Sequence, residues 1–158
     1  MSGIKIRPAH LKDLDILLAF EQAIIEYERP MVTNMMTDKF HYYDLRELVI
    51  SENAQVVVAE QNGQLIGSGY AKQERSRNYL INEFHSFLGF MYIAPEFRGM
   101  GINQLIIDNL IQWSKDRGLR VVCLTVFNEN DSAVKAYQKL GFKKDIVEMR
   151  LALDDESC

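Results

Sequence analysis

Apolar side chains in the first 51 residues follow a helical period after one short alternating segment. Residues 4–7 alternate apolar and basic side chains, which predicts a short strand. Residues 9–28 predict a long amphipathic helix that ends near Pro30, because proline disfavours a helical conformation in the residue before it. Residues 42–51 predict a second, weaker helix. The long helix is indicated by Leu11, Leu14, Leu17, Leu18, Ile24 and Ile25.

The middle of the chain is rich in β-branched and other apolar residues and predicts three strands. Residues 55–60 and 65–70 flank Asn62 and Gly63, and Asn-Gly between two such runs is a strong signal for a β-hairpin. A third, nearly all-apolar strand is predicted over residues 84–94. These three strands are expected to pair antiparallel.

The last third of the chain alternates between helices and strands. We predict a helix over residues 101–117, a buried strand over 119–127, a helix over 131–140 and a final strand over 146–153. Gly141 stands where it would stop the second of these helices.

The resulting order is β, α, α, β, β, β, α, β, α, β. It predicts an α/β (α+β) fold with a mixed, mostly antiparallel central sheet and helices on both faces. One strand–helix–strand crossover, from residue 84 to residue 127, should place two strands parallel. A length of 158 residues suits one domain, which we assign to residues 1–153, with residues 154–158 as an acidic tail.

Composition narrows the functional classes. Apolar residues make up 47% and charged residues 25%, as in globular proteins and unlike disordered chains. The net charge of −4 disfavours nucleic-acid binding through a basic face. The sequence contains no run of 18 apolar residues, and residues 1–5 lack the apolar core of a signal peptide, so we expect a cytoplasmic protein without membrane contact. Cys123, Cys158 and three scattered histidines fit no zinc pattern, and we expect no metal.

The most informative segment, residues 92–104, joins the end of a buried strand to the start of a helix through a short glycine-bearing turn. The first N–H groups of a helix lack internal partners and form an anion site. Gly99 and Gly101 would let a phosphate approach the backbone, and Arg98 adds a positive charge. A glycine-rich connection without a ligand is the alternative interpretation.

A second segment, residues 128–142, follows another buried strand and opens the last helix. Asn130 or Asp131 can cap this helix. Tyr137 lies near its end, where a buried structural tyrosine is the simplest interpretation of that residue alone.

Taken together, the two segments resemble the GCN5-related N-acetyltransferase (GNAT) superfamily, and the predicted element order is also that of this family. Residues 98–103 match its pyrophosphate-binding pattern except at Asn103, where a glycine or alanine is usual. The second signature is matched in type and spacing by Asn130, Ala133, Tyr137, Gly141 and Phe142. The resemblance covers residues 4–153.

The resemblance implies an acetyl-CoA-dependent N-acetyltransferase that moves an acetyl group to a primary amine by direct attack in a ternary complex. It implies that Tyr137 is the general acid for the departing CoA thiolate. Asn103 puts close approach of the helix in doubt and suggests weakened or altered CoA binding. The implied cofactor-binding residues are Met91, Tyr92, Ile93, Arg98, Gly99, Met100, Gly101, Ile102, Asn103, Gln104 and Asn130.

The general base is the main departure from the family's commoner pattern. The family often places a glutamate at positions that are occupied here by Phe87 and Thr125, and neither can accept a proton. Glu83 or His85 could take that role from the same strand. Glu26, Tyr27 and Glu28, at the end of the first long helix, are further candidates.

The acceptor is expected to be a small-molecule or peptide amine, and a homodimer is compatible with the sequence. Met31, Met35, Met36, Phe40, Tyr42 and Tyr43 could line the acceptor site or form a satellite hydrophobic cluster. A non-catalytic acyl-CoA-binding regulatory module of the same fold is the alternative function, favoured by the missing carboxylate and by Asn103. A nucleotide-binding protein is disfavoured because the phosphate-loop Lys-Ser/Thr pattern is absent.

Overall fold

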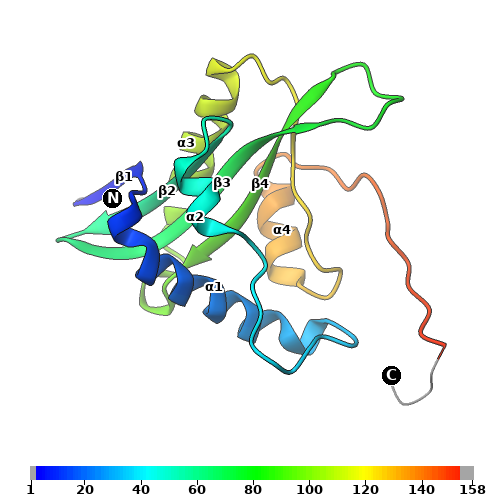
Figure 1. The fold of residues 1–158 in the computed structure, drawn as a ribbon, viewed down its shortest axis with the longest axis horizontal. Coiled ribbons are helices and arrows are strands. Elements are labelled where there is room, and N and C mark those ends of the chain that lie inside the picture. Colours follow the sequence, from blue (N-terminus) through cyan, green and yellow to red (C-terminus); the bar gives the residue numbers. More distant parts are fainter. Residues whose placement is uncertain (1–2, 154–158) are drawn as a thin grey trace.

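The computed structural model describes residues 3–153 and has one five-stranded sheet flanked by helices (Figure 1). The strands are β1 (Ile4–Pro8), β2 (Ala54–Gln61), β3 (Gln64–Arg75), β4 (Phe84–Ile93) and β5 (Val122–Cys123). The helices are α1 (Leu14–Glu28), α2 (Leu45–Ile50), α3 (Ile102–Asp116) and α4 (Asp131–Lys139). Short 3₁₀ turns at Leu11–Asp13, Arg29–Met31 and Pro95–Phe97 precede or follow these elements.

The sheet order is β1-β2-β3-β4-β5, and the pairs β1–β2, β2–β3 and β3–β4 are antiparallel. β4 and β5 are parallel, as the crossover through α3 predicts. The predicted hairpin is confirmed, since Asn62 and Gly63 join β2 to β3 with φ values of 52° and 79°. Two positive φ values are what a two-residue type I′ turn requires.

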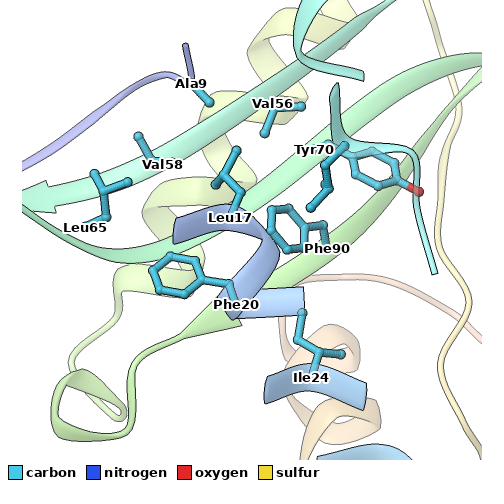
Figure 2. Close-up of a cluster of buried hydrophobic side chains, with 10 residues drawn as sticks. Ala9, Leu17, Phe20, Ile24, Val56, Val58, Leu65, Tyr70 and Phe90 are labelled. Atoms are coloured by element: carbon cyan, nitrogen blue, oxygen red, sulfur yellow. The ribbon is translucent and has the colours of Figure 1, made fainter. Parts of the chain in front are cut away.

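Alternation along β2 divides the apolar side chains between two cores, one on each face of the sheet. Val56 and Val58 point to a core that α1 and α2 cover with Leu17 and Leu45, and Figure 2 shows α1 residues closing over this face. Val57 and Ala59 belong to the other core, which α3 covers with four residues: Ile102, Ile106, Ile107 and Leu110. α4 adds Tyr137 and Leu140 to the edge of that second core. The prediction of helices on both faces is therefore confirmed.

The structure corrects three sequence predictions. The first helix begins at Leu14 rather than at residue 9, because residues 11–13 form a 3₁₀ turn. The strand predicted over residues 119–127 is reduced to Val122–Cys123, and the final strand predicted over 146–153 is absent. In the described part of the chain, residues 143–153 are extended but have no strand beside them, and β5 has a partner only on the β4 side. Without a partner, apolar alternation alone does not make a strand.

The acidic tail predicted for residues 154–158 lies outside the described residues. Between residues 3 and 153, no helix is long and apolar enough to cross a membrane. The same residues hold no group of three or more His, Cys, Asp or Glu side chains that could bind a metal ion.

Candidate functional site

A β-bulge interrupts β4 in the middle of the sheet. Ser68 of β3 pairs with Tyr92 and Tyr70 pairs with Gly89, so Phe90 and Met91 together face the single residue Gly69. Phe90 has φ 59°, which is unusual for a bulky residue. The bulge turns the backbone of β4 at the point where its edge toward β5 becomes free. Backbone conformations of this kind cluster at functional sites.

Two side chains hold the turned peptide groups of Phe90. The Ser68 hydroxyl donates a hydrogen bond to the Phe90 carbonyl at 3.0 Å, and the Phe90 N–H donates one to the Tyr43 hydroxyl at 3.3 Å. Tyr43 is in turn packed edge-to-face against Tyr70 and Phe90, with ring centroids 5.4 and 5.6 Å away. The bulge is therefore fixed by groups from β3 and from the segment before α2.

The buried carboxylate of Glu21 positions the segment that carries Tyr43. Its Oε2 accepts hydrogen bonds from the backbone N–H groups of Tyr42 and Tyr43 at 2.7 and 2.9 Å, and its Oε1 lies 2.7 Å from Nδ1 of His41. Glu21 is fully buried within α1. A charge in that position is tolerable because both oxygens have donors. It links α1 to the loop that reaches the bulge.

β4 and β5 pair only over a short length, which opens the sheet beyond the pairing. Ser86 and Phe87 lie opposite Val122 and Cys123, and β5 ends there. From Leu88 to Ile93 the edge of β4 that faces away from β3 has no strand beside it in the described chain. The bulge at Phe90 lies within this free edge.

The glycine-bearing turn after β4 presents backbone N–H groups at the start of α3. Gly99 and Gly101 have φ values of 77° and 80°, the left-handed region that suits glycine. A Cβ at either position would meet no atom within 4 Å, so the conformation and not crowding requires glycine there. The first backbone hydrogen bond of the helix runs from Leu105 N–H to Gly101 O, so the preceding N–H groups have no helical acceptor within residues 3–153. An anion can approach these groups.

Arg98 folds back toward the end of β4 instead of extending along α3. Its Nε donates a hydrogen bond to the carbonyl of Ile93 at 3.0 Å, and its guanidinium lies 5.9 Å from the centroid of the Tyr27 ring. The side chain is exposed. It therefore holds the turn to the end of the strand and places its positive charge beside the Tyr27 ring.

α4 carries the second predicted group of residues. Asn130 is buried and caps the helix, because its side-chain oxygen accepts a hydrogen bond from Ala133 N–H at 3.4 Å. Tyr137 packs against Phe142, with ring centroids 5.9 Å apart. Burial and, to a smaller extent, the nearby Glu28 carboxylate together raise the pKa of the Tyr137 hydroxyl to about 12. Tyr137 thus stays protonated at neutral pH.

Glu28, the last residue of α1, places a carboxylate among the tyrosines of the site. Burial raises its pKa, while the nearby Tyr42 hydroxyl lowers it by less. The Glu28 charge also raises the pKa values of Tyr42, Tyr43 and Tyr137, which places all three close to it. The Tyr42 hydroxyl is buried and has no hydrogen-bond partner within 3.5 Å in the described chain. Glu28 therefore acts electrostatically on tyrosines of the segment before α2 and on the tyrosine of α4.

The two bases predicted first lie at the other end of β4. Glu83 precedes the strand, is exposed and pairs with Arg75 at 3.3 Å. His85 is five residues from Phe90, roughly 17 Å along a strand, and both of its ring nitrogens already have partners. Nδ1 lies 3.1 Å from the Ser76 hydroxyl, and Nε2 lies 3.2 Å from Glu74. The structure does not bring these two side chains to the bulge.

Sequence reasoning did not single out Glu21, Tyr43 or Phe90 as parts of the site. A glutamate in an amphipathic helix is expected to face solvent, so the sequence did not indicate that Glu21 is buried. Nothing in the sequence distinguishes Phe90 from other apolar strand residues. Tyr43 was included only as one member of an aromatic cluster near the acceptor side. Glu28 was one of three candidates at the end of α1, and its burial now distinguishes it from the exposed Glu26 and Tyr27.

Several proteins are similar to this chain in sequence over part of their length. An uncharacterized N-acetyltransferase of Methanocaldococcus jannaschii is 34% identical over 100 residues, covering 57% of this chain and 40% of its own. A probable N-acetyltransferase, camello, of Xenopus tropicalis is 28% identical over 104 residues, covering 66% of this chain and 45% of its own. The chain thus spans less than half the length of these relatives.

Solved structures share the fold over nearly the whole chain. A predicted acetyltransferase from Clostridium acetobutylicum, solved with acetyl-CoA, has a TM-score of 0.74 and 20% identity, covering 95% of this chain and 96% of its own. The aminoglycoside 6′-N-acetyltransferase AAC(6′)-IG from Acinetobacter haemolyticus has a TM-score of 0.73 and 19% identity, covering 95% and 99%. A sequence model described as the acetyltransferase (GNAT) family matches residues 20–142. The chain therefore belongs to the acetyltransferase (GNAT) family.

Proposed function

We propose that this protein transfers an acetyl group from acetyl-CoA to a primary amine by direct attack in a ternary complex. The observation that carries the proposal is the free edge of β4, which contains the bulge at Phe90 and runs into the glycine turn before α3. Fold relatives were solved with acetyl-CoA or with a bisubstrate analogue of CoA and an aminoglycoside, which supports the same ligand class here.

The residues of the turn suit the CoA pyrophosphate. The N–H groups of residues 99–104 have no helical acceptor among the described residues, and the space around the Gly99 and Gly101 Cα atoms is open. Arg98 adds a positive charge at the start of the turn. Asn103 is half-buried at the last position of the pattern, where its amide would either avoid a phosphate or donate to it. The backbone of Met91, Tyr92 and Ile93 is the natural partner for the pantetheine arm, because that edge of β4 needs hydrogen-bond partners.

In the reaction, the neutral amine nitrogen attacks the thioester carbonyl carbon, so that a C–N bond forms and the C–S bond breaks. Free backbone N–H groups of β4 beside the bulge would donate to the developing oxyanion, and each such donor is worth about 3 kcal/mol. The thiolate leaves and takes the hydroxyl proton of Tyr137, and the proton that the attacking nitrogen loses as the amide forms restores the Tyr137 hydroxyl. A thiol has a pKa of about 8.5 and Tyr137 one of about 12, so this transfer is uphill unless thiolate and hydroxyl already share a hydrogen bond.

We propose that Glu28, rather than Glu83 or His85, binds the acceptor ammonium group and accepts its proton. A primary amine has a pKa of about 10.4 and must lose a proton before it attacks. A half-buried carboxylate of raised pKa attracts the ammonium group and can accept that proton. The nearby tyrosines would bound the acceptor, and a cationic small molecule or peptide amine is the class that fits. Asn130 would lie beside the pantetheine while capping α4.

The test is CoA thiol release from acetyl-CoA, measured against a panel of polyamines, amino sugars, amino acids and short peptides. Amine-dependent release is expected, and Tyr137→Phe should reduce it at least tenfold with near-normal acetyl-CoA affinity. The matched control is Tyr79→Phe, because Tyr79 is exposed and lies outside the site.

Acetyl-CoA binding without turnover on any amine would favour the alternative function, a non-catalytic acyl-CoA-binding regulatory module. Phe87 and Thr125, which carry no carboxylate, are the residues that keep this alternative open. Full activity of Tyr137→Phe would instead remove the general-acid role and leave the enzyme. The absence of acetyl-CoA binding would contradict both functions.

A further inference from the structure

Residues 40–43, near the end of the connection from α1 to α2, carry Tyr43 to the bulge without forming a helix or a strand. Within the described chain they take part in no backbone–backbone hydrogen bond, and side chains of α1 hold them instead. Gln22 Nε2 donates a hydrogen bond to the carbonyl of Phe40 at 2.9 Å, and the Glu21 carboxylate accepts the N–H groups of the last two residues. Figure 1 shows this connection doubling back across α1 before it enters α2. The position of Tyr43 therefore depends on two α1 side chains.

His41 is the charge partner of the Glu21 carboxylate. Its Nδ1 lies 2.7 Å from Glu21 Oε1, and within residues 3–153 no lysine or arginine nitrogen lies within 4.0 Å of that carboxylate. Glu21 is completely shielded from solvent, whereas the His41 side chain is 49% exposed. A buried carboxylate stays charged only where donors and a cation replace the lost water. His41 supplies the proton that faces Oε1, and in its protonated form it supplies the positive charge as well.

A chain of contacts leads from the half-exposed His41 to the bulge in β4. His41 contacts the Glu21 carboxylate, which accepts the N–H of Tyr43. The Tyr43 hydroxyl in turn accepts the N–H of Phe90. These contacts join residues that are 20, 22 and 47 positions apart, so none is a by-product of a local turn or helix. A polar network whose members are all satisfied holds a single geometry, so a change at His41 should reach the backbone of β4.

His41 also lines an open hollow of about 400 Å³ between α1 and α2. Leu14 and Leu18 form its apolar side, and the charged side chains that line it together with His41 are Asp44 and Arg46. Asp44 is engaged as the N-cap of α2, where its side chain accepts a backbone N–H at 3.1 Å. A molecule of the size of imidazole can therefore reach the place of the His41 ring from solvent.

We propose that His41 is a positioning residue for acetyl transfer, which acts through Glu21 and Tyr43 and not on the reacting atoms. Its imidazole holds the buried carboxylate in place, the carboxylate fixes the backbone of Tyr43, and the Tyr43 hydroxyl holds the N–H of Phe90. The free N–H groups of β4 beside the bulge are thereby kept where the thioester carbonyl would bind. This inference rests on the proposed function, because it concerns the rate of that reaction.

Replacement of His41 tests whether the rate depends on the imidazole. His41→Ala should lower kcat for amine acetylation about tenfold and leave the acetyl-CoA affinity within about twofold, since residues 98–104 lie outside the chain of contacts. His41→Asn should recover about half of the wild-type kcat, because its amide N–H can take the place of Nδ1–H. His10→Ala is the matched control, since His10 is an exposed histidine outside the chain of contacts. Circular dichroism at the assay temperature establishes that each variant is folded.

A double-mutant cycle with Tyr43→Phe separates positioning from a general loss of stability. If His41 acts through the Tyr43 hydroxyl, His41→Ala should lower kcat by less than about twofold in the Tyr43→Phe background. Imidazole at about 50 mM should restore the kcat of His41→Ala but not that of the double variant, because the hydroxyl is then missing. Thiazole, a ring of similar size without an N–H group, should restore neither.

The outcomes distinguish this inference from the proposed function. Wild-type kcat in His41→Ala, or equal losses from that change in the wild-type and Tyr43→Phe backgrounds, would overturn the positioning role and leave the acetyltransferase. A wild-type chain that releases no CoA thiol with any amine would overturn the proposed function, and the positioning role with it.

Discussion

The backbone N–H of Phe90 donates a hydrogen bond to the Tyr43 hydroxyl at 3.3 Å, across 47 positions of sequence. Strand β4 is thereby tied to the loop before α2. Phe90 has φ 59°, and a bulky side chain in that region is strained by about 1–3 kcal/mol. The Tyr43 hydroxyl accepts the hydrogen bond of the Phe90 N–H in place of a carbonyl of β3. It thereby stabilises the bulge on which the proposed acetyl site depends.

Tyr43→Phe should weaken the bulge while preserving the aromatic packing. Loss of the bond leaves the Phe90 N–H without its acceptor, and we expect a loss of about 1 kcal/mol in the free energy of unfolding. Acetyl-CoA turnover should fall more than the stability change alone explains, because the oxyanion donors are displaced. Urea unfolding and steady-state kinetics would measure both. Tyr79→Phe serves as the control, and equal turnover of the two variants would show that Tyr43 does not support the site.

Glu21→Ala should be among the most damaging single changes in α1. It removes the acceptor for the N–H groups of Tyr42 and Tyr43 and leaves a buried cavity, so we expect a loss of about 3 kcal/mol. Glu26→Ala, on an exposed position of the same helix, should cost less than about 0.5 kcal/mol. Chemical denaturation compares the two directly, and similar losses would refute the anchoring role of Glu21.

Gly89→Ala should destabilise the sheet through a clash rather than through backbone conformation. A Cβ at Gly89 would lie 2.6 Å from Tyr70 Cζ and the Tyr70 hydroxyl oxygen, and the ring is buried. We expect a cost of about 1–3 kcal/mol, as for other overpacked cores. Gly63→Ala is the comparison, because it meets no neighbour but has φ 79°, which costs about 1 kcal/mol. If replacing Tyr70 by leucine in the Gly89→Ala variant does not recover any stability, the clash is not the cause.

Asp13 should contribute to acid unfolding. Its hydrogen bonds from Arg7, at 3.0 and 3.1 Å, hold the pKa of the carboxyl below its usual value. A carboxyl whose pKa is lowered by folding stabilises the protein above its unfolded pKa of about 4, and that stability is lost as the pH falls toward the lower folded value. Asp13→Asn should therefore lose stability at pH 7 and show a flatter profile below pH 4. Asp15→Asn, on an exposed position, should keep the wild-type profile.

The hairpin at Asn62 and Gly63 and the helix after Gly101 could be predicted from sequence because their signals are local. Each depends on residues within a few positions, such as two glycine-compatible φ values or a helical apolar period. β5 was overpredicted because a strand is defined by its neighbours, and only β4 lies beside it. The segment over residues 146–153 alternates as a strand should, yet nothing in one copy pairs with it.

The candidate site also has one part that the sequence indicates and one part that it does not. Gly99, Gly101, Asn130 and Tyr137 lie in motifs whose spacing can be read along the chain. The conformation of Phe90 depends on partners that are 22 and 47 positions away, and no local pattern indicates them. The burial that raises the Glu28 pKa likewise has no signal in the local sequence pattern. Sequence spacing therefore predicts where the cofactor would bind but not how the acceptor side is built.

Glu28→Gln should separate activity from stability. A carboxyl whose pKa is raised by folding favours the folded state at low pH, and this contribution is lost as the pH rises through the raised value. Glutamine removes the cost of burying a charge at neutral pH, so the variant should be at least as stable as the wild type. The amine would lose its base, and kcat/KM for the amine should fall about 100-fold at pH 7, with acetyl-CoA affinity within twofold.

The loss of kcat/KM in Glu28→Gln should become smaller as the pH approaches 10, because the amine then loses its proton without a base. Glu26→Gln, on the exposed side of the same turn, controls for a general change in charge. The same comparison in Glu83→Gln and His85→Gln decides between the candidate bases, because both lie at the far end of β4. A Glu28→Gln variant that keeps its neutral-pH activity, beside a His85→Gln variant that loses it, would move the proton acceptor to His85 and require a chain of water molecules to the bulge.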